Sequence, residues 1–100
     1  MKKLKIVTVC QFGMGTTILM KTLIEEICKE ENIPAEVIPE NINGVWGRLD
    51  ADLIVTNETL VDQLKRMGKP VVGIRDFVDK EDAKRRLWEV LKQMGYSKEG

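Results

Sequence analysis

Hydrophobic positions along this chain follow two different periods, which alternate from one segment to the next. Short runs of aliphatic and β-branched residues predict strands, because such residues favour extended backbone. The predicted strands cover residues 4–9, 35–39, 52–56 and 70–74. Between them, apolar residues recur every three or four positions, which is the spacing of a helix that buries one face. The pattern therefore predicts four successive pairs of strand and helix.

The first two helical segments differ in regularity. The first spans residues 17–31 and ends at a turn around Pro34. The second, over residues 42–49, is interrupted by Gly44 and Gly47, so we expect a short or irregular helix there. The stripe predicted to face the core in the first helix consists of Ile18, Leu19, Leu23, Ile24, Ile27 and Cys28.

The last two helices carry recognisable start and stop signals. Thr59, followed three positions later by Asp62, is typical of a helix start, and Gly68 is typical of a helix end. Asp79 is expected to cap the final helix, which should end near Gly95.

Strands that alternate with helices through short connections predict an α/β fold. Crossovers between parallel strands are right-handed and place helices on both faces of the sheet. We expect a four-stranded parallel sheet in the flavodoxin-like order 2-1-3-4, within three layers, α/β/α. One such domain would take up residues 1–95 and leave residues 96–100 as a C-terminal tail. Ligands of such sheets bind at the carboxyl ends of the strands where the winding direction reverses, here between strands one and three.

A cysteine lies at that point of reversal. Cys10 follows the first predicted strand and opens a segment that leads into the first helix: Gln11, Phe12, Gly13, Met14, Gly15, Thr16 and Thr17. The glycines let backbone N–H groups curl round an anion, the helix dipole attracts negative charge, and the hydroxyls add donors. We predict Cys10 as a nucleophile that takes up a phosphoryl group and residues 11–17 as the loop that binds it, since this transfer depends on positioning and charge stabilisation.

Other polar residues end neighbouring strands at the same edge. Thr56 and Asn57 follow the third strand, which should adjoin the first, so we expect them close to the thiol. Arg75 follows the fourth strand and must reach roughly 10 Å across two strand spacings. We treat these three residues as candidate accessory groups of the site.

Composition and charge exclude several functions. Basic and acidic residues number 16 each, so no net field draws the chain to nucleic acid or to an anionic membrane. No apolar run approaches the roughly 20 residues that would insert into a bilayer. The sequence contains no histidine, which excludes metal sites built on histidine and Ser–His or Cys–His catalysis, and we expect neither a metal nor a cofactor. Two cysteines in 100 residues fit reduced thiols in the cytoplasm.

One residue separates a phosphoryl carrier from a cysteine phosphatase. A phosphatase of low molecular weight carries arginine at the sixth position after its cysteine, where the guanidinium grips phosphate with two hydrogen bonds. Here that position is Thr16, and no acid stands out by motif to protonate a leaving group. The sequence therefore favours a phosphocysteine that is passed onward over one that is hydrolysed.

At these residues the chain resembles the IIB components of the bacterial phosphoenolpyruvate-dependent sugar phosphotransferase system. It looks most similar to the ascorbate and galactitol type, and more distantly to the lactose and cellobiose type. The resemblance covers nearly the whole chain and is carried by the strand ending in Cys10, the loop closing on Thr16-Thr17, the following Ile18-Leu19-Met20-Lys21, and Val71-Val72-Gly73-Ile74-Arg75.

The resemblance implies a function and two partners. In that family the loop cysteine accepts a phosphoryl group from a histidine of the IIA component and passes it to a sugar bound by the membrane component IIC. Carried over, Cys10 would be the phosphorylation site of a cytoplasmic phosphotransferase, and residues 11–17 would cradle the phosphate. Two alternatives stay open: a phosphatase or arsenate reductase with a degenerate loop, and a flavodoxin-like binding module without chemistry.

Overall fold

A computed structural model describes residues 3–11, 13–48 and 50–95 of the chain. The predicted tail at 96–100 lies outside the described residues, as do Phe12 of the predicted loop and the last position of the predicted 42–49 helix. The elements, in chain order, are β1 (Leu4–Val9), α1 (Met14–Glu30), β2 (Ala35–Pro39), the 3₁₀ helix η1 (Gly44–Gly47), β3 (Leu53–Asn57), η2 (Glu58–Leu60), α2 (Val61–Leu64), η3 (Lys65–Met67), β4 (Val71–Ile74) and α3 (Lys80–Gln93).

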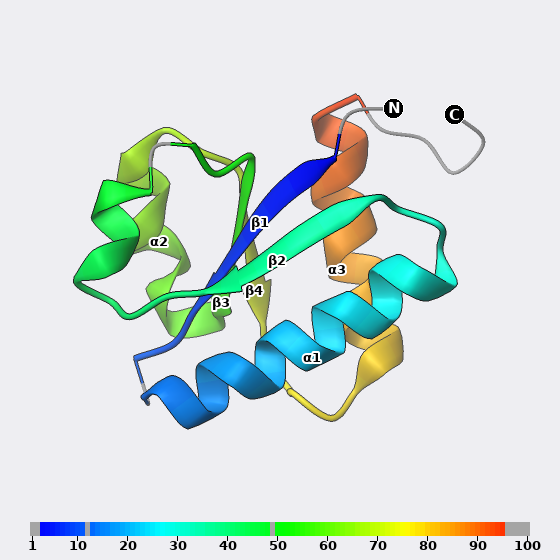
Figure 1. Ribbon diagram of the computed structural model, residues 1–100, viewed down its shortest axis with the longest axis horizontal. Coiled ribbons are helices and arrows are strands. Elements are labelled where there is room, and N and C mark those ends of the chain that lie inside the picture. Colours follow the sequence, from blue (N-terminus) through cyan, green and yellow to red (C-terminus); the bar gives the residue numbers. More distant parts are fainter. Residues whose placement is uncertain (1–2, 12, 49, 96–100) are drawn as a thin grey trace.

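The four strands form one parallel sheet in the order β2-β1-β3-β4, which confirms the predicted fold class and strand order. Helices α1 and α3 cover one face, and α2 with the short 3₁₀ segments covers the other (Figure 1). Because β1 lies between β2 and β3, the chain reverses its winding direction at the carboxyl end of β1. Cys10 follows β1 directly, so the topology places it at the edge where such folds bind ligands.

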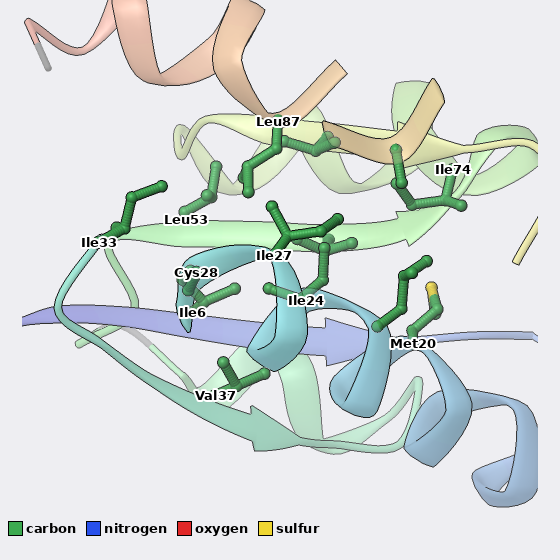
Figure 2. Packing of buried hydrophobic residues seen from close by; sticks show 14 of the residues in the cluster. Ile6, Met20, Ile24, Ile27, Cys28, Ile33, Val37, Leu53, Ile74 and Leu87 are labelled. Atoms are coloured by element: carbon green, nitrogen blue, oxygen red, sulfur yellow. The ribbon is translucent and has the colours of Figure 1, made fainter. Parts of the chain in front are cut away.

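Successive side chains of each strand point to opposite faces of the sheet, so they contribute to two separate hydrophobic clusters. In β1, Leu4 and Ile6 point into the cluster beneath α1 and α3, whereas Val7 and Val9 point into the cluster beneath α2. The first cluster is the larger, and Figure 2 shows side chains of α1 packed between that helix and the strands. Its labelled members are Ile6, Met20, Ile24, Ile27, Cys28, Ile33, Val37, Leu53, Ile74 and Leu87.

The buried face of α1 differs from the predicted stripe at its beginning. The helix begins at Met14, three positions earlier than expected, and buries Thr17 and Met20 in its first turns. Ile18 is 48% exposed and Leu19 is 61% exposed, so their prediction as core residues was wrong. Thr17 and Met20 share a face with Ile24 at spacings of three and four, and the hydroxyl of Thr17 is used inside the fold. A count of apolar residues cannot recognise a threonine that replaces a core residue in this way.

The second layer is built from tight turns. The predicted 42–49 helix is reduced to the single 3₁₀ turn of η1, as its two glycines suggested. The helix expected from Thr59 has only four α-helical residues, Val61–Leu64, between two 3₁₀ turns. It ends at Gly68, whose φ of 74° is left-handed, as predicted.

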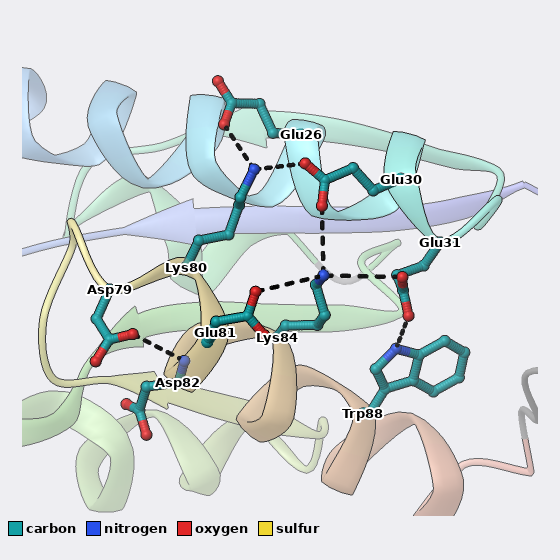
Figure 3. A network of polar contacts seen from close by, with 9 residues as sticks. All are labelled: Glu26, Glu30, Glu31, Asp79, Lys80, Glu81, Asp82, Lys84 and Trp88. Atoms are coloured by element: carbon teal, nitrogen blue, oxygen red, sulfur yellow. Dashed lines mark hydrogen bonds and ion pairs between the residues drawn. The ribbon is translucent and has the colours of Figure 1, made fainter.

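Ion pairs join α1 to α3 along the molecular surface (Figure 3). Lys80 and Lys84 both contact Glu30, and Trp88 Nε1 donates to Glu31 Oε1 at 3.0 Å. The hydrogen bond from Lys80 is the main reason that the pKa of Glu30 is lowered. Because exposed ion pairs contribute little to stability, the alignment of α1 and α3 depends chiefly on the apolar cluster beneath them.

Asp79 is the N-cap that the sequence predicted for α3, since its Oδ1 accepts a hydrogen bond of 3.1 Å from the N–H of Asp82. We expect Asp79→Ala to lower the free energy of unfolding by about 0.5–2 kcal/mol, because the first turn of α3 then loses its acceptor. Urea denaturation of both proteins measures the difference. Asp79→Asn, which keeps the oxygen, should retain most of the stability, and an equal loss in both variants would contradict the capping role.

Candidate functional site

Cys10 ends β1 with its side chain on the side of α1. The residue continues the alternation of Leu4 and Ile6 and belongs to the same apolar cluster. It is 4% exposed, so the thiol is buried and does not project into solvent. Any chemistry at this sulfur therefore requires a movement of its side chain or of the residues that cover it.

The segment after Cys10 turns sharply into α1 at Gly13. Gly13 is the N-cap residue, with φ 113° and ψ 173°, a conformation that residues with a Cβ atom rarely adopt. Its N–H approaches the carbonyl oxygen of Cys10 at 3.5 Å, and its own carbonyl accepts the N–H of Thr17 at 3.2 Å. The turn therefore brings the first amides of α1 close to the end of β1.

The beginning of α1 has the features of an anion-binding site. The first N–H groups of a helix have no acceptor within it, and Gly13 offers no side chain to cap them. The first turn, all of it described, contains no acidic residue. The amides of Met14, Gly15 and Thr16 and the helix dipole therefore favour a negative charge here, and a cradle of this kind suits a phosphoryl group.

The two threonines of the predicted loop have different surroundings. Thr17 is buried, and its Oγ1 donates to the carbonyl oxygen of Gly13 at 3.1 Å. Its carbonyl oxygen in turn accepts a hydrogen bond of 3.3 Å from Thr8 Oγ1 on β1. Thr17 therefore ties α1 to the sheet, and Thr16, which is half-buried, keeps its hydroxyl nearer the surface. Thr8 was not predicted, although a polar residue inside an apolar strand is a signal that could have indicated it.

Asn57 is the accessory candidate that contacts the loop. It is the last residue of β3 and is 4% exposed. The backbone N–H of Gln11 donates to Asn57 Oδ1 at 3.3 Å, and Asn57 Nδ2 donates to Thr59 Oγ1. The end of β3 is thus connected to the residue that follows Cys10.

Thr56 and Arg75 occupy other parts of the surroundings. Thr56 pairs with Val9, so alternation directs its side chain to the α2 side of the sheet, opposite Cys10. Its buried Oγ1 has no hydrogen-bond partner among the described residues. Arg75 is exposed and lines a polar surface cavity of about 470 Å³ with Asp76, Asp79, Asp82, Arg85 and Arg86.

Two further groups complete the surroundings of the site. Cys28 is buried in α1, and desolvation together with the nearby carboxylate of Glu25 raises the pKa of its thiol to about 11. It is therefore a poor nucleophile near neutral pH. Within the described ranges no three residues of the metal-binding types come together in a way that would hold an ion.

Exposed apolar side chains lie beside the beginning of α1. Met14 is 44% exposed, and with Ile18 and Leu19 it forms an apolar strip on the first turns of the helix. Leu19 also lines a surface groove of about 420 Å³ opposite Phe77 and Val78 of the β4–α3 connection. We call these five residues the apolar rim. An exposed apolar surface of this kind is a common feature of protein interaction sites.

Comparison with known proteins identifies the family. A sequence model of the family described as "PTS system, Lactose/Cellobiose specific IIB subunit" matches residues 5–89. The chain belongs to this family. The resemblance recognised in the sequence at Cys10 and its loop is thereby confirmed at the level of the family, a component of a sugar phosphotransferase system.

Relatives of this IIB chain carry names of the ascorbate type. It is 32% identical over 92 residues to the ascorbate-specific PTS system EIIB component of Mycoplasma pneumoniae, a match that covers 90% of this chain and 97% of that protein. The corresponding component of Salmonella typhimurium is 28% identical over 91 residues, covering 89% and 90% of the two chains.

A solved structure supports the IIB fold. The lactose-specific IIB component domain from Streptococcus pneumoniae superposes with a TM-score of 0.68 over 91% of this chain and 97% of that one, at 20% sequence identity. Within the described residues, no helix is both long and apolar enough to cross a membrane.

Proposed function

We propose that this IIB chain is a cytoplasmic phosphoryl carrier in which Cys10 accepts a phosphoryl group from a phosphohistidine of a IIA component and passes it to a sugar bound by a membrane IIC component. The observation that carries the proposal is the position of Cys10 in a IIB chain, at the end of β1 and beside the uncapped N-terminus of α1. We also propose that residues 1–95 act as one unit in this role, with 96–100 as a tail.

The transfer consists of two substitutions at phosphorus. The thiol of Cys10 first loses its proton to water; the thiolate sulfur then forms a bond to phosphorus while the bond from phosphorus to the imidazole nitrogen of the donor breaks, and that nitrogen takes up a proton from water. In the second step the oxygen of a sugar hydroxyl forms the new bond to phosphorus and gives up its proton, while the bond to sulfur breaks and the thiolate is restored. The amides of Met14, Gly15 and Thr16 would stabilise the charge on the phosphoryl oxygens in both steps.

The buried thiol represents the resting state in this proposal. With Cys10 only 4% exposed, a donor cannot reach Sγ until the side chain turns toward the first turn of α1. Gly13 and exposed Gln11, on either side of the turn, are the described residues whose backbone would have to adjust. Such an opening on partner contact would keep the thiol from other reactions between transfers.

The absence of an arginine from the first turn of α1 favours transfer over hydrolysis. Thr16 stands in place of the arginine with which phosphatases grip the phosphate. Arg86, whose guanidinium contacts β4, is already bonded to Glu58 and to the carbonyl oxygen of Gly73, and Arg75 lines the separate surface cavity described above. A phosphoryl group on Cys10 would therefore await an acceptor that a partner supplies.

Mass spectrometry of the intact chain tests the proposal. After incubation with phosphoenolpyruvate, the general phosphotransferase proteins and a IIA component, the wild-type chain should gain the mass of one phosphoryl group and keep it in buffer. Peptide mapping should place the group on Cys10. Turnover of aryl phosphates or arsenate without any partner would support the phosphatase instead, and no mass change would support a binding module without chemistry.

The apolar rim supports a protein partner at this site, and we propose that the IIA donor docks on it. We expect Ile18→Glu to lower kcat/KM for phosphorylation by at least about fivefold, mainly through KM, because the new carboxylate would be desolvated in the complex. The rate of phosphorylation is measured at several donor concentrations. Gln63→Glu, an exposed position on α2, is the matched control and should behave as wild type. Equal kinetics for both variants would rule out docking at Ile18.

A further inference from the structure

The hydrogen bonds of Asn57 connect the site to the rest of the fold. Asn57 is buried at the end of β3, the strand next to β1, and its Oδ1 faces the backbone N–H of Gln11 at 3.3 Å. That N–H can only donate, so the atom facing it must be the oxygen, and the amide nitrogen is left to donate to Thr59 Oγ1. The orientation of the amide is therefore fixed at both ends.

The segment that carries Asn57 is firmly held. Asn57 precedes η2, and the backbone of Glu58 packs on β4 at Gly73, where an added Cβ would lie 3.3 Å from Glu58 Cα and 2.6 Å from Val61 Cγ2. Arg86 Nη1 donates both to Glu58 Oε2 and to the carbonyl oxygen of Gly73, each at 3.1 Å. The segment of Asn57 is thus supported by contacts to β4 and α3 in addition to its hydrogen bond to Gln11.

The bond to Gln11 is long for an N–H···O hydrogen bond, which usually spans 2.7–3.2 Å. Hydrogen bonds to phosphate oxygens are charge-assisted and roughly twice as strong as those between neutral groups. The Gln11 N–H is the first amide after Cys10, and it would exchange the Asn57 oxygen for a phosphate oxygen at little expense. While Cys10 is unmodified this amide is occupied by Asn57 Oδ1, and the exchange would make it available when phosphate arrives.

We infer that Asn57 is a positioning residue for phosphoryl transfer: it holds the Gln11 peptide in place while Cys10 is unmodified and releases the N–H to the phosphoryl group. This inference rests on the proposed function. Asn57 acts through the loop and, being buried, does not contact the donor. Its loss should therefore change kcat and leave the KM for the donor unchanged.

Three variants test the inference. Asn57→Ala leaves the Gln11 N–H without a group to hold it in position, so its hydrogen bond to the incoming phosphoryl group should be weakened and kcat for phosphorylation lowered by about 3–10-fold, with KM unchanged. Thr59→Val keeps the size of an exposed side chain but removes the partner of Asn57 Nδ2, and a smaller fall in kcat is expected. Should Asn57→Ala fail to fold, Thr59→Val preserves the test. A kcat equal to that of wild type in both variants, or an effect confined to KM, would overturn the inference.

Asn57→Asp provides a test without any donor. It keeps an acceptor for Gln11 but adds a carboxylate near the thiol, so the pH profile for alkylation of Cys10 by iodoacetamide should move to higher pH by about 0.5–1 unit. Cys28→Ala as background ensures that one thiol is followed. Asn57→Ala adds no charge and should instead raise the rate of alkylation, because the Gln11 peptide is no longer held beside the covered thiol.

The neighbouring charges make the test specific. Glu58, on the same segment, is paired with Arg86. Glu40, which follows β2, is paired with Arg48. Arg75 and Asp76 follow β4, the strand beside β3, and Asn57→Asp leaves both unchanged.

The two sets of measurements separate the two claims. Equal rates of alkylation in wild type and Asn57→Ala would overturn the positioning role even if wild-type protein is phosphorylated. If the rate rises in Asn57→Ala but wild-type protein is never phosphorylated, the proposed function fails and the coupling between Asn57 and the loop stands.

Discussion

Replacement of Cys10 by serine is expected to abolish phosphorylation by the IIA donor under conditions that label wild-type protein completely. A serine hydroxyl at this position lacks the easily ionised thiol, and the chain has no histidine that could act as its base or take its place. Intact mass after incubation with the donor system measures the loss. Because residue 10 is buried, circular dichroism must first show that the variant is folded.

Cys28→Ala is the matched control for this experiment. It removes the other cysteine of the chain, whose raised pKa of about 11 makes it unreactive near neutral pH. This variant should be phosphorylated as wild type, with a loss of about 1 kcal/mol in stability from the smaller core side chain. A phosphoryl group that persists in Cys10→Ser, or disappears in Cys28→Ala, would contradict the assignment of Cys10.

Gly13→Ala should produce the largest loss of stability among changes in the loop. At φ 113° and ψ 173° an alanine is strained by its own backbone, and we expect a loss of about 1–3 kcal/mol in the free energy of unfolding. Apart from its chain neighbours, no described residue has an atom within 4 Å of the added Cβ, so the loss would come from conformation and not from a clash. Urea denaturation monitored by circular dichroism measures it.

Gly15→Ala is the control two positions away. Gly15 lies in the first turn of α1 with an ordinary φ and open space around its Cβ position. Alanine favours helix, so this variant should be as stable as wild type or more stable by up to about 1 kcal/mol. Equal losses in both variants would show that the conformation of Gly13 does not hold the turn.

Much of the fold could be predicted because the signals were local. The strand of residues 4–9 and the strand of residues 35–39 have the predicted bounds, and Asp79 and Gly68 act as the cap and the stop that their types indicate. Errors arose where a helix had more apolar residues than it could bury. Ile18 and Leu19 are exposed because Thr17 and Met20 take the positions against the sheet.

The candidate site was predicted less completely than the fold. A cysteine after a strand, followed by Gly13 and the start of a helix, pointed to the carboxyl edge of the sheet, and β1 does end there. The burial of Cys10 and the different surroundings of Thr16 and Thr17 depend on how α1 packs, which residue types alone do not reveal. For the same reason the sequence could place Thr56 and Asn57 at this edge of the sheet, but it could not predict their hydrogen bonds.

The sequence itself determined the order of strands and helices, the parallel sheet and the place of Cys10 at the edge of that sheet. It could do so because the hydrophobic period, the helix caps and the handedness of crossovers each depend on short segments of the chain. The tertiary structure alone decided that Asn57 holds the amide of Gln11, 46 positions away in the chain, and that the thiol is covered at rest. Such contacts depend on how α1 is rotated against the sheet and on how the strands of the sheet pair with one another. Those are set by the fit of all buried side chains together, and no single segment encodes them.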